Sequence, residues 1–269
     1  MWNQQRILLT GAAGNMGRLV RGMLRGQVAL LRVSDIAPMD AAQAGEELWP
    51  CDLADTDALA RAMGGVDAVV HLAASLNVDD WQQTLDVNIA GTYHVYDAAR
   101  RAGVKRVVYA SSHHAVGMYP VEQRIGLDAR LRPDSLYGLS KCFGESLAQY
   151  HWDKFGLESV CWRIGSARAA PSPREPREYT TWLSEPDLER LLHASLTARD
   201  VGCSLVYGVS QNGEVWWDNA QAAHLGFVPQ DRAVAPADAA AGGPSYPLQG
   251  GKRAMHGLLD GKDRLCAKA

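Results

Sequence analysis

A tyrosine and a lysine four positions apart give the strongest chemical signal in this sequence. They are Tyr137 and Lys141, in the stretch SLYGLSK at 135–141. On a helix, residues with this spacing lie on the same face, so the lysine ammonium comes close to the phenol. A neighbouring positive charge favours the phenolate and lowers a tyrosine pKa that is ordinarily about 10. The pair therefore indicates a general base that works near neutral pH.

A serine upstream fits the same chemistry. Ser112 follows the apolar run at 104–110, which has the character of a buried strand. A hydroxyl at the end of such a strand can hydrogen-bond a reacting oxygen, although on its own it more often only terminates the strand. Together with Tyr137 and Lys141, the catalytic role is the favoured interpretation.

The elements that would position these residues alternate between strands and helices. Strands are predicted at 6–10, 28–33, 46–51, 66–72, 104–110, 157–164 and 204–209, and helices at 18–25, 55–63, 81–102, 137–154 and 181–196. Strands separated by helices predict a parallel, doubly wound α/β sheet.

The first predicted strand runs directly into a glycine-rich loop. Gly11, Gly14 and Gly17 stand between this strand and a helix, which suits a tight turn and the close approach of a pyrophosphate to the helix N-terminus. Asp35 lies 18 residues after Gly17, at the end of the second strand, where an acid binds the ribose hydroxyls of adenosine. A helix cap is the other interpretation of Asp35. An acid at this place would repel a 2′-phosphate, so NAD and not NADP is the predicted cofactor.

The composition excludes several classes of function. The 269 residues include 27 Lys+Arg and 30 Asp+Glu, for a formal net charge of −3, which gives no basic footprint for nucleic acid. No apolar run approaches the roughly 20 residues needed to cross a membrane, and the N-terminus leads into a strand and not a signal peptide. The five cysteines are scattered without metal-ligand spacing, so a reduced, cytoplasmic protein without a metal site is expected.

Taken together, the motifs of this chain resemble those of the extended short-chain dehydrogenase/reductases. The matching stretches include TGAAGNMG (10–17), HLAAS (71–75), YASSHHAVG (109–117) and YGLSK (137–141). Several stretches resemble those of the uronate dehydrogenase branch of that family. They are SSHHAVGMYP (111–120), LYGLSKCFGE (136–145), WRIGS (162–166), WWDN (216–219) and LQGG (248–251). The resemblance implies oxidation of glucuronate or galacturonate at C1 to the aldarolactone, with hydride transferred to NAD.

The resemblance also implies a role for each matched residue. Tyr137 would take the proton from the anomeric hydroxyl, Lys141 would lower the pKa of Tyr137 and hold the nicotinamide ribose, and Ser112 would bind the reacting oxygen. Cofactor contacts are implied along the carboxyl ends of the strands. They are Gly11, Gly14, Asn15, Met16, Gly17, Asp35, Asp52, Leu53, Leu72, Ala73, Ala74, Ser75, Asn88, Tyr137, Lys141 and Ser166.

A uronate carboxylate needs a cationic partner, and arginine forms paired hydrogen bonds with carboxylates. Arg177 falls where the family places its substrate arginine, and Arg174 is an alternative three residues earlier. The other implied substrate contacts are Ser75, Ser112, His113 and His114. WWDN at 216–219 is interpreted as a frame for the arginine loop.

Three positions depart from the family pattern. His113 replaces an asparagine, Leu76 stands where a serine is usual, and Leu248 replaces an aromatic residue before QGG. These departures leave NAD and redox chemistry unaffected but leave the identity of the sugar open.

We expect residues 1–165 to form an NAD-binding Rossmann domain that carries the catalytic residues, and 166–269 a small substrate lobe packed on it. The expected partners are a small sugar acid and further copies of the chain. Two other readings stay open. One is a sugar-nucleotide epimerase or dehydratase on the same scaffold, and the other is a non-catalytic module that senses NAD(H).

Overall fold

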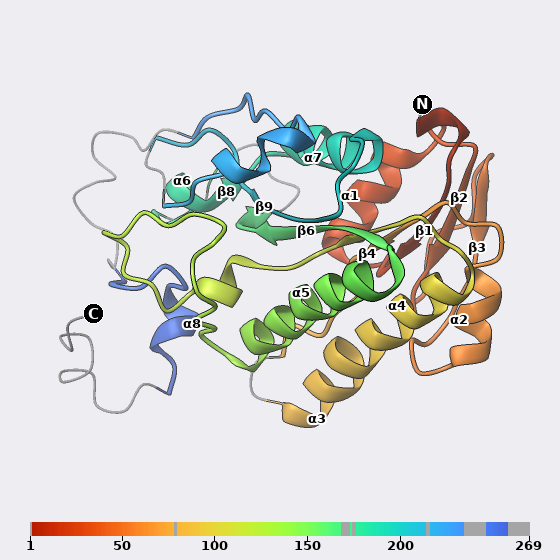
Figure 1. The fold of residues 1–269 in the computed structure, drawn as a ribbon, viewed down its shortest axis with the longest axis horizontal. Coiled ribbons are helices and arrows are strands. Elements are labelled where there is room, and N and C mark those ends of the chain that lie inside the picture. Colours follow the sequence, from red (N-terminus) through yellow and green to blue (C-terminus); the bar gives the residue numbers. More distant parts are fainter. Residues whose placement is uncertain are drawn as a thin grey trace.

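The computed structural model describes residues 2–77, 80–167, 173, 176–213, 216–233 and 246–257. Its centre is a seven-stranded sheet in the order β3-β2-β1-β4-β5-β6-β9 (Figure 1), and every neighbouring pair is parallel. This confirms the predicted doubly wound α/β class. The strands are β1 Arg6–Thr10, β2 Leu30–Ser34, β3 Glu46–Leu48, β4 Ala68–His71, β5 Arg106–Tyr109, β6 Glu158–Ile164 and β9 Cys203–Gly208, with a separate pair of β7 Ser166–Ala167 and β8 Trp182–Leu183.

Helices cover both faces of this sheet. The longer α-helices are α1 Asn15–Leu24, α2 Thr56–Ala62, α4 Gly91–Arg101, α5 Leu136–Phe155 and α7 Glu185–Thr197. The shorter helical segments are η1 Trp2–Gln4, α3 Trp81–Gln83, η2 Thr84–Ala90, η3 His113–Val116, α6 Glu178–Thr181, η4 Ala220–Leu225 and α8 Lys252–Met255. None of the helices in the described parts of the chain is long and apolar enough to span a membrane.

The two faces of the sheet build two hydrophobic cores because side chains alternate along a strand. Ile7 and Leu9 of β1 point into a core with α1 and α7, whereas Leu8 points into a core with α2, α4 and α5. Figure 1 shows the same arrangement, with α4 and α5 side by side on one side of the sheet and α1 beside α7 on the other. The helix of the predicted general base, α5, is therefore fixed against the sheet.

Two predicted helices differ from the structure. The continuous helix expected at 81–102 is divided by the π-helical segment η2, in which the Gly91 N–H bonds to the Asp86 carbonyl five residues back. The helix predicted at 181–196 begins only at Glu185, because the Ser184 side chain caps it by accepting from the Asp187 N–H. The residues before Ser184 form α6 and β8 instead.

The sheet reverses its winding direction between β1 and β4, which are neighbours although β1 continues to β2 and β4 to β5. In open α/β sheets, ligands bind at the carboxyl ends of the strands beside such a switch point. The glycine loop after β1, the segment after β4 and the serines after β5 all lie at this edge. The fold therefore places the candidate site at the carboxyl end of the sheet, beside the switch point.

Candidate active site

The loop after β1 packs so closely against its neighbours that two of its positions can hold only glycine. Gly11 has a φ of +74°, and a Cβ there would lie 2.5 Å from the Ala73 nitrogen in the segment after β4. A Cβ at Gly17, on the first turn of α1, would lie 2.0 Å from the Gly11 carbonyl oxygen. The backbone loop is thus packed tightly against the switch point, with the N-terminus of α1 open to a phosphate group. These residues fit a dinucleotide.

Asp35 stands at the rim of the same loop. Its Oδ2 accepts a hydrogen bond from the Ala13 N–H at 2.9 Å, and its Oδ1 accepts one from the Ala37 N–H at 2.9 Å. The carboxylate is thereby fixed between the glycine loop and the end of β2. This is the position in which an acid can receive the two ribose hydroxyls of an adenosine.

Asn88 connects the segment after β4 to the helix of Tyr137. Its side chain accepts from the Ser75 N–H at 2.7 Å and donates to the Ser75 carbonyl at 2.9 Å. The same amide donates to Ser140 Oγ at 3.2 Å, and Ser140 Oγ donates to the Tyr137 carbonyl at 2.7 Å. The π-helical turn of η2 presents Asn88 for these three bonds, as such turns often do at functional sites.

The other cofactor candidates lie at the same edge of the sheet. Leu72 continues from β4 with its N–H on the Thr10 carbonyl, and Ala73 and Ala74 follow. Leu53 is buried against α4, and Ser166 on β7 shares a 2.8 Å hydrogen bond with Thr181. Asn15 and Met16 begin α1, and Asp52 follows β3.

The three predicted catalytic residues come together. Tyr137, Lys141 and Ser112 are 9%, 3% and 5% exposed. The Ser112 hydroxyl lies close enough to Tyr137 to lower its pKa, and the Lys141 ammonium lies 5.3 Å from the centre of the Tyr137 ring. Ser135 caps α5 by accepting from the Gly138 N–H, which fixes the first turn carrying Tyr137.

The pKa of Tyr137 in the ligand-free protein is governed mainly by burial, and the lowering expected from Lys141 stays a prediction. Burial raises the pKa of Tyr137 above 10, and the groups that oppose this are Arg253 and the Ser112 hydroxyl. Lys141 is itself buried, and burial lowers its pKa to about 7. Burial thus opposes the charged form of both side chains, the Tyr137 phenolate and the Lys141 ammonium.

His113 is a neutral hydrogen-bond relay. Burial holds its pKa well below the ordinary value of 6.5. Its Nδ1 lies 2.8 Å from the Ile164 carbonyl oxygen and must donate, so Nε2 is the acceptor for the Arg177 guanidinium at 2.8 Å. A histidine in this tautomer holds an arginine without adding a second positive charge.

His114 makes a comparable pair with a buried carboxyl group. Its Nδ1 lies 2.6 Å from Asp134 Oδ2, and its ring centre lies 5.9 Å from that of Tyr137. Burial lowers the pKa of His114 and raises that of Asp134. Since the neutral ring donates through Nδ1, its Nε2 remains an acceptor that a sugar hydroxyl can use.

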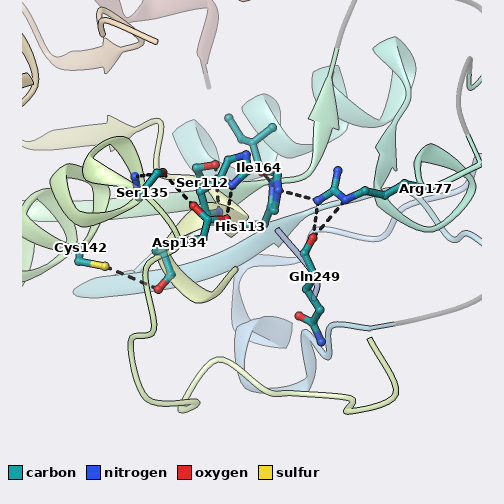
Figure 2. A network of polar contacts seen from close by, with 11 residues as sticks. Ser112, His113, Asp134, Ser135, Cys142, Ile164, Arg177 and Gln249 are labelled. Atoms are coloured by element: carbon teal, nitrogen blue, oxygen red, sulfur yellow. Dashed lines mark hydrogen bonds and ion pairs between the residues drawn. The ribbon is translucent and has the colours of Figure 1, made fainter. Parts of the chain in front are cut away.

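Arg177 lies between His113 and a distant segment of the chain, as Figure 2 shows. Its Nε and Nη2 donate to the Gln249 carbonyl oxygen at 3.1 and 2.5 Å. Trp216 lies 5.9 Å from the guanidinium, so the aromatic frame predicted around the arginine loop is present at Arg177. Arg174, the predicted alternative, lies outside the described residues.

Sequence reasoning missed two residues of this site. Asp134 stands just before the predicted helix at 137–154 and was given no role, yet its carboxylate is buried between Gly117 and Gly250, where added Cβ atoms would lie 1.9 and 2.0 Å from it. Arg253 lies over the Tyr137 ring, and only its place two residues after LQGG hinted at it. Of the departures, Leu248 is fully buried, whereas Leu76 is 63% exposed.

Comparisons with known proteins agree with this geometry. The uronate dehydrogenase of Pseudomonas putida is 46% identical over 260 residues, which cover 94% of this chain and 96% of that protein. The crystal structure of uronate dehydrogenase from Agrobacterium tumefaciens has a TM-score of 0.87 and 41% identity, and the match covers 94% of this chain and 97% of that one. A tyrosine-to-alanine mutant of the Agrobacterium enzyme complexed with NAD also has a TM-score of 0.87, with 39% identity over 95% of this chain and 99% of that one.

The family match covers six of the seven strands of the sheet, β1 to β6, and the helix α5. Residues 7–185 fit the profile described as the NAD dependent epimerase/dehydratase family. That range holds the glycine loop, Asp35, Ser112, Tyr137, Lys141 and Arg177. The resemblance inferred from the motifs is thus confirmed, and the chain belongs to the NAD dependent epimerase/dehydratase family.

Proposed function

We propose that this protein oxidises a hexuronate, glucuronate or galacturonate, at C1 to the aldarolactone with NAD as the oxidant. The observation that carries the proposal is a guanidinium, Arg177, held by neutral His113 beside the Tyr137 site. An arginine in this setting suits a carboxylate. The 41–46% identity to named uronate dehydrogenases over most of the chain supports the same substrate class.

The reaction needs one base and one hydride acceptor. The cyclic sugar is already a hemiacetal, so removing the hydroxyl proton and the C1 hydride gives the lactone without water. Tyr137 takes the proton, and the Ser112 hydroxyl stabilises the same oxygen by hydrogen bonding. NAD, held by Gly11, Gly14, Gly17 and Asp35, accepts the hydride when bound.

The substrate side comes from two parts of the chain. Arg177 pairs with the sugar carboxylate, while His114 Nε2 accepts from a ring hydroxyl. We assign residues 1–165 to NAD binding and catalysis, and 166–269 to a substrate lobe packed on the same domain. We also propose a cytoplasmic homo-oligomer. The scattered spacing of the five cysteines supports the compartment.

The test is NADH formation by the purified protein with NAD and a panel of glucuronate, galacturonate, glucose, galactose and UDP-glucose. Fast turnover of the uronates, with at most a weak rate for the neutral hexoses, is the expected result. NAD that co-purifies and does not turn over would favour the epimerase reading. The sensor reading makes a different prediction. NAD binds, no sugar reacts, and Tyr137→Phe leaves the effect of the protein on its cell unchanged.

A further inference from the structure

A second cation faces the general base from a part of the chain far away in sequence. The Arg253 guanidinium carbon lies 5.0 Å from the centre of the Tyr137 ring. Lys141, one helical turn along α5, lies 5.3 Å from the same ring centre. Tyr137 is therefore flanked by two basic side chains, one from its own helix and one from α8.

The segment before Arg253 is anchored by buried hydrogen bonds. The Gln249 side chain donates to the carbonyls of Pro120 and Gln123 and accepts from the Trp217 indole at 2.8 Å. The next residue, Gly250, donates to the Gly117 carbonyl at 2.8 Å. Because these bonds fix the chain just ahead of α8, they also fix where Arg253 emerges.

Gly251 makes the turn that brings α8 to the site. Its φ is +63°, and an added Cβ would lie 2.8 Å from Arg177 Cδ. The Ala254 N–H then closes the first turn of α8 on the Gly251 carbonyl at 3.1 Å. The same short stretch thus holds Arg177 through the Gln249 carbonyl and directs Arg253 to Tyr137.

The charged and titratable groups around the Tyr137 phenol shift its pKa in different directions. Burial raises the pKa of Tyr137, Asp134 adds to that rise, and Arg253 is the largest opposing influence. His114 is neutral, and burial also raises the pKa of neighbouring Tyr109. Lys141 has a pKa of about 7 and is only partly charged near neutral pH, whereas an arginine keeps its charge throughout the working range.

We propose that Arg253 is a positioning residue for the general base, a permanently charged group that favours the Tyr137 phenolate. Arg253 adds a second positive charge to that of Lys141 at the ring, so the base depends in part on a residue outside the Ser112–Tyr137–Lys141 set. This inference deepens the proposed function, since it concerns the group that takes the substrate proton.

The test compares Arg253→Gln, Arg253→Lys and the control Lys252→Gln. Lys252 is an exposed neighbour on α8. Removing the guanidinium should move the acidic limb of the kcat/KM profile to higher pH by about one pH unit. Arg253→Lys keeps the positive charge and should bring the profile most of the way back to that of the wild type. Lys252→Gln should leave the profile unchanged. An unmoved limb, or a raised KM with an unmoved limb, would overturn the proposal, and the second result would make Arg253 a substrate contact.

A second measurement does not require a substrate. Tyrosinate absorbance is titrated for the wild type and for Arg253→Gln, each corrected by a counterpart that also carries Tyr137→Phe. The difference isolates the Tyr137 phenol among nine tyrosines. Its pKa should be higher in Arg253→Gln. If the sugar panel gives no turnover but this shift appears, the proposed function fails while the role of Arg253 stands. Equal titrations would remove that role whatever the enzyme oxidises.

Discussion

The cofactor side and the substrate side of this site are built in opposite ways. The cofactor side consists largely of backbone in segments that directly follow strands, such as the loop from Gly11 to Gly17, which is closed by contacts within a few residues and by the neighbouring strand end. The substrate side consists of side chains joined over long sequence distances. Arg177 reaches His113 across 64 residues and the Gln249 carbonyl across 72.

This difference separates what is general from what is specific. A dinucleotide is recognised by backbone groups and by one acid, so the same short motif serves any reaction that uses NAD. In the proposed function, the sugar is recognised by side chains from α5, η3 and the arginine segment, which the Gln249 carbonyl holds. These parts can each change separately. The cofactor side therefore identifies the chemistry, and the substrate side identifies the molecule.

The largest effect should come from the residue shared by both sides. Tyr137→Phe removes the proton acceptor and should lower kcat for glucuronate by about 10²–10⁴-fold. NAD affinity should stay near the wild-type value, because the glycine loop and Asp35 are unchanged. Turnover assays together with NAD titration calorimetry check both parts. Activity within a few-fold of wild type would exclude Tyr137 as the base.

Two glycines of α1 give a matched test of the cofactor side. Gly17→Ala places a Cβ 2.0 Å from the Gly11 carbonyl oxygen and should abolish measurable NAD binding. Gly22→Ala is the control, because nothing lies within 4 Å of its Cβ. The control should bind NAD normally and gain up to about 1 kcal/mol in the free energy of unfolding from its helix propensity. Normal NAD binding by both variants would show that the loop is not a tight cradle.

Arg177→Gln tests the substrate side alone. Losing the charge pair with the sugar carboxylate costs a few kcal/mol, so KM for a uronate should rise by about a hundredfold. The weak rate with the parent hexose should not change, and NAD affinity should also be retained. Arg124→Gln is the control, since the side chain of this arginine is 61% exposed and pairs with Asp218 on the surface. Equal effects on uronate and hexose would remove Arg177 from the carboxylate site.

The smallest effect concerns the choice between the two nicotinamide cofactors. Asp35→Ser keeps a hydroxyl acceptor near the Ala13 N–H but removes the charge that repels a 2′-phosphate. The ratio of kcat/KM for NAD over NADP should fall by about tenfold, which corresponds to about 1.4 kcal/mol. Asp35→Asn, of the same shape, separates charge from size. An unchanged ratio in both variants would show that Asp35 is not the ribose ligand.

What can be predicted from the sequence also differs between the cofactor side and the substrate side. The strand–glycine–helix unit and the Tyr137–Lys141 pair are contiguous patterns, so the fold class and the proximity of Lys141 to Tyr137 were predictable. The start of α7 was not, because the Ser184 cap overrides the helical pattern that begins at Thr181. Arg253 and Asp134 belong to no local pattern. Only the folded chain brings them to Tyr137 and His114.

The π-helical turn at Asn88 has a consequence for how this chain can change its length. Such a turn is equivalent to one residue inserted into an α-helix. Deleting a residue between Thr84 and Ala90 would restore a regular helix with better hydrogen bonds, but it would rotate Asn88 by about 100° relative to the following helix. The amide would then leave Ser75 and Ser140. A shorter chain would thus fold into a more regular helix and a less well-ordered site, so the regularity of the helix and the order of the site make opposite demands on this segment.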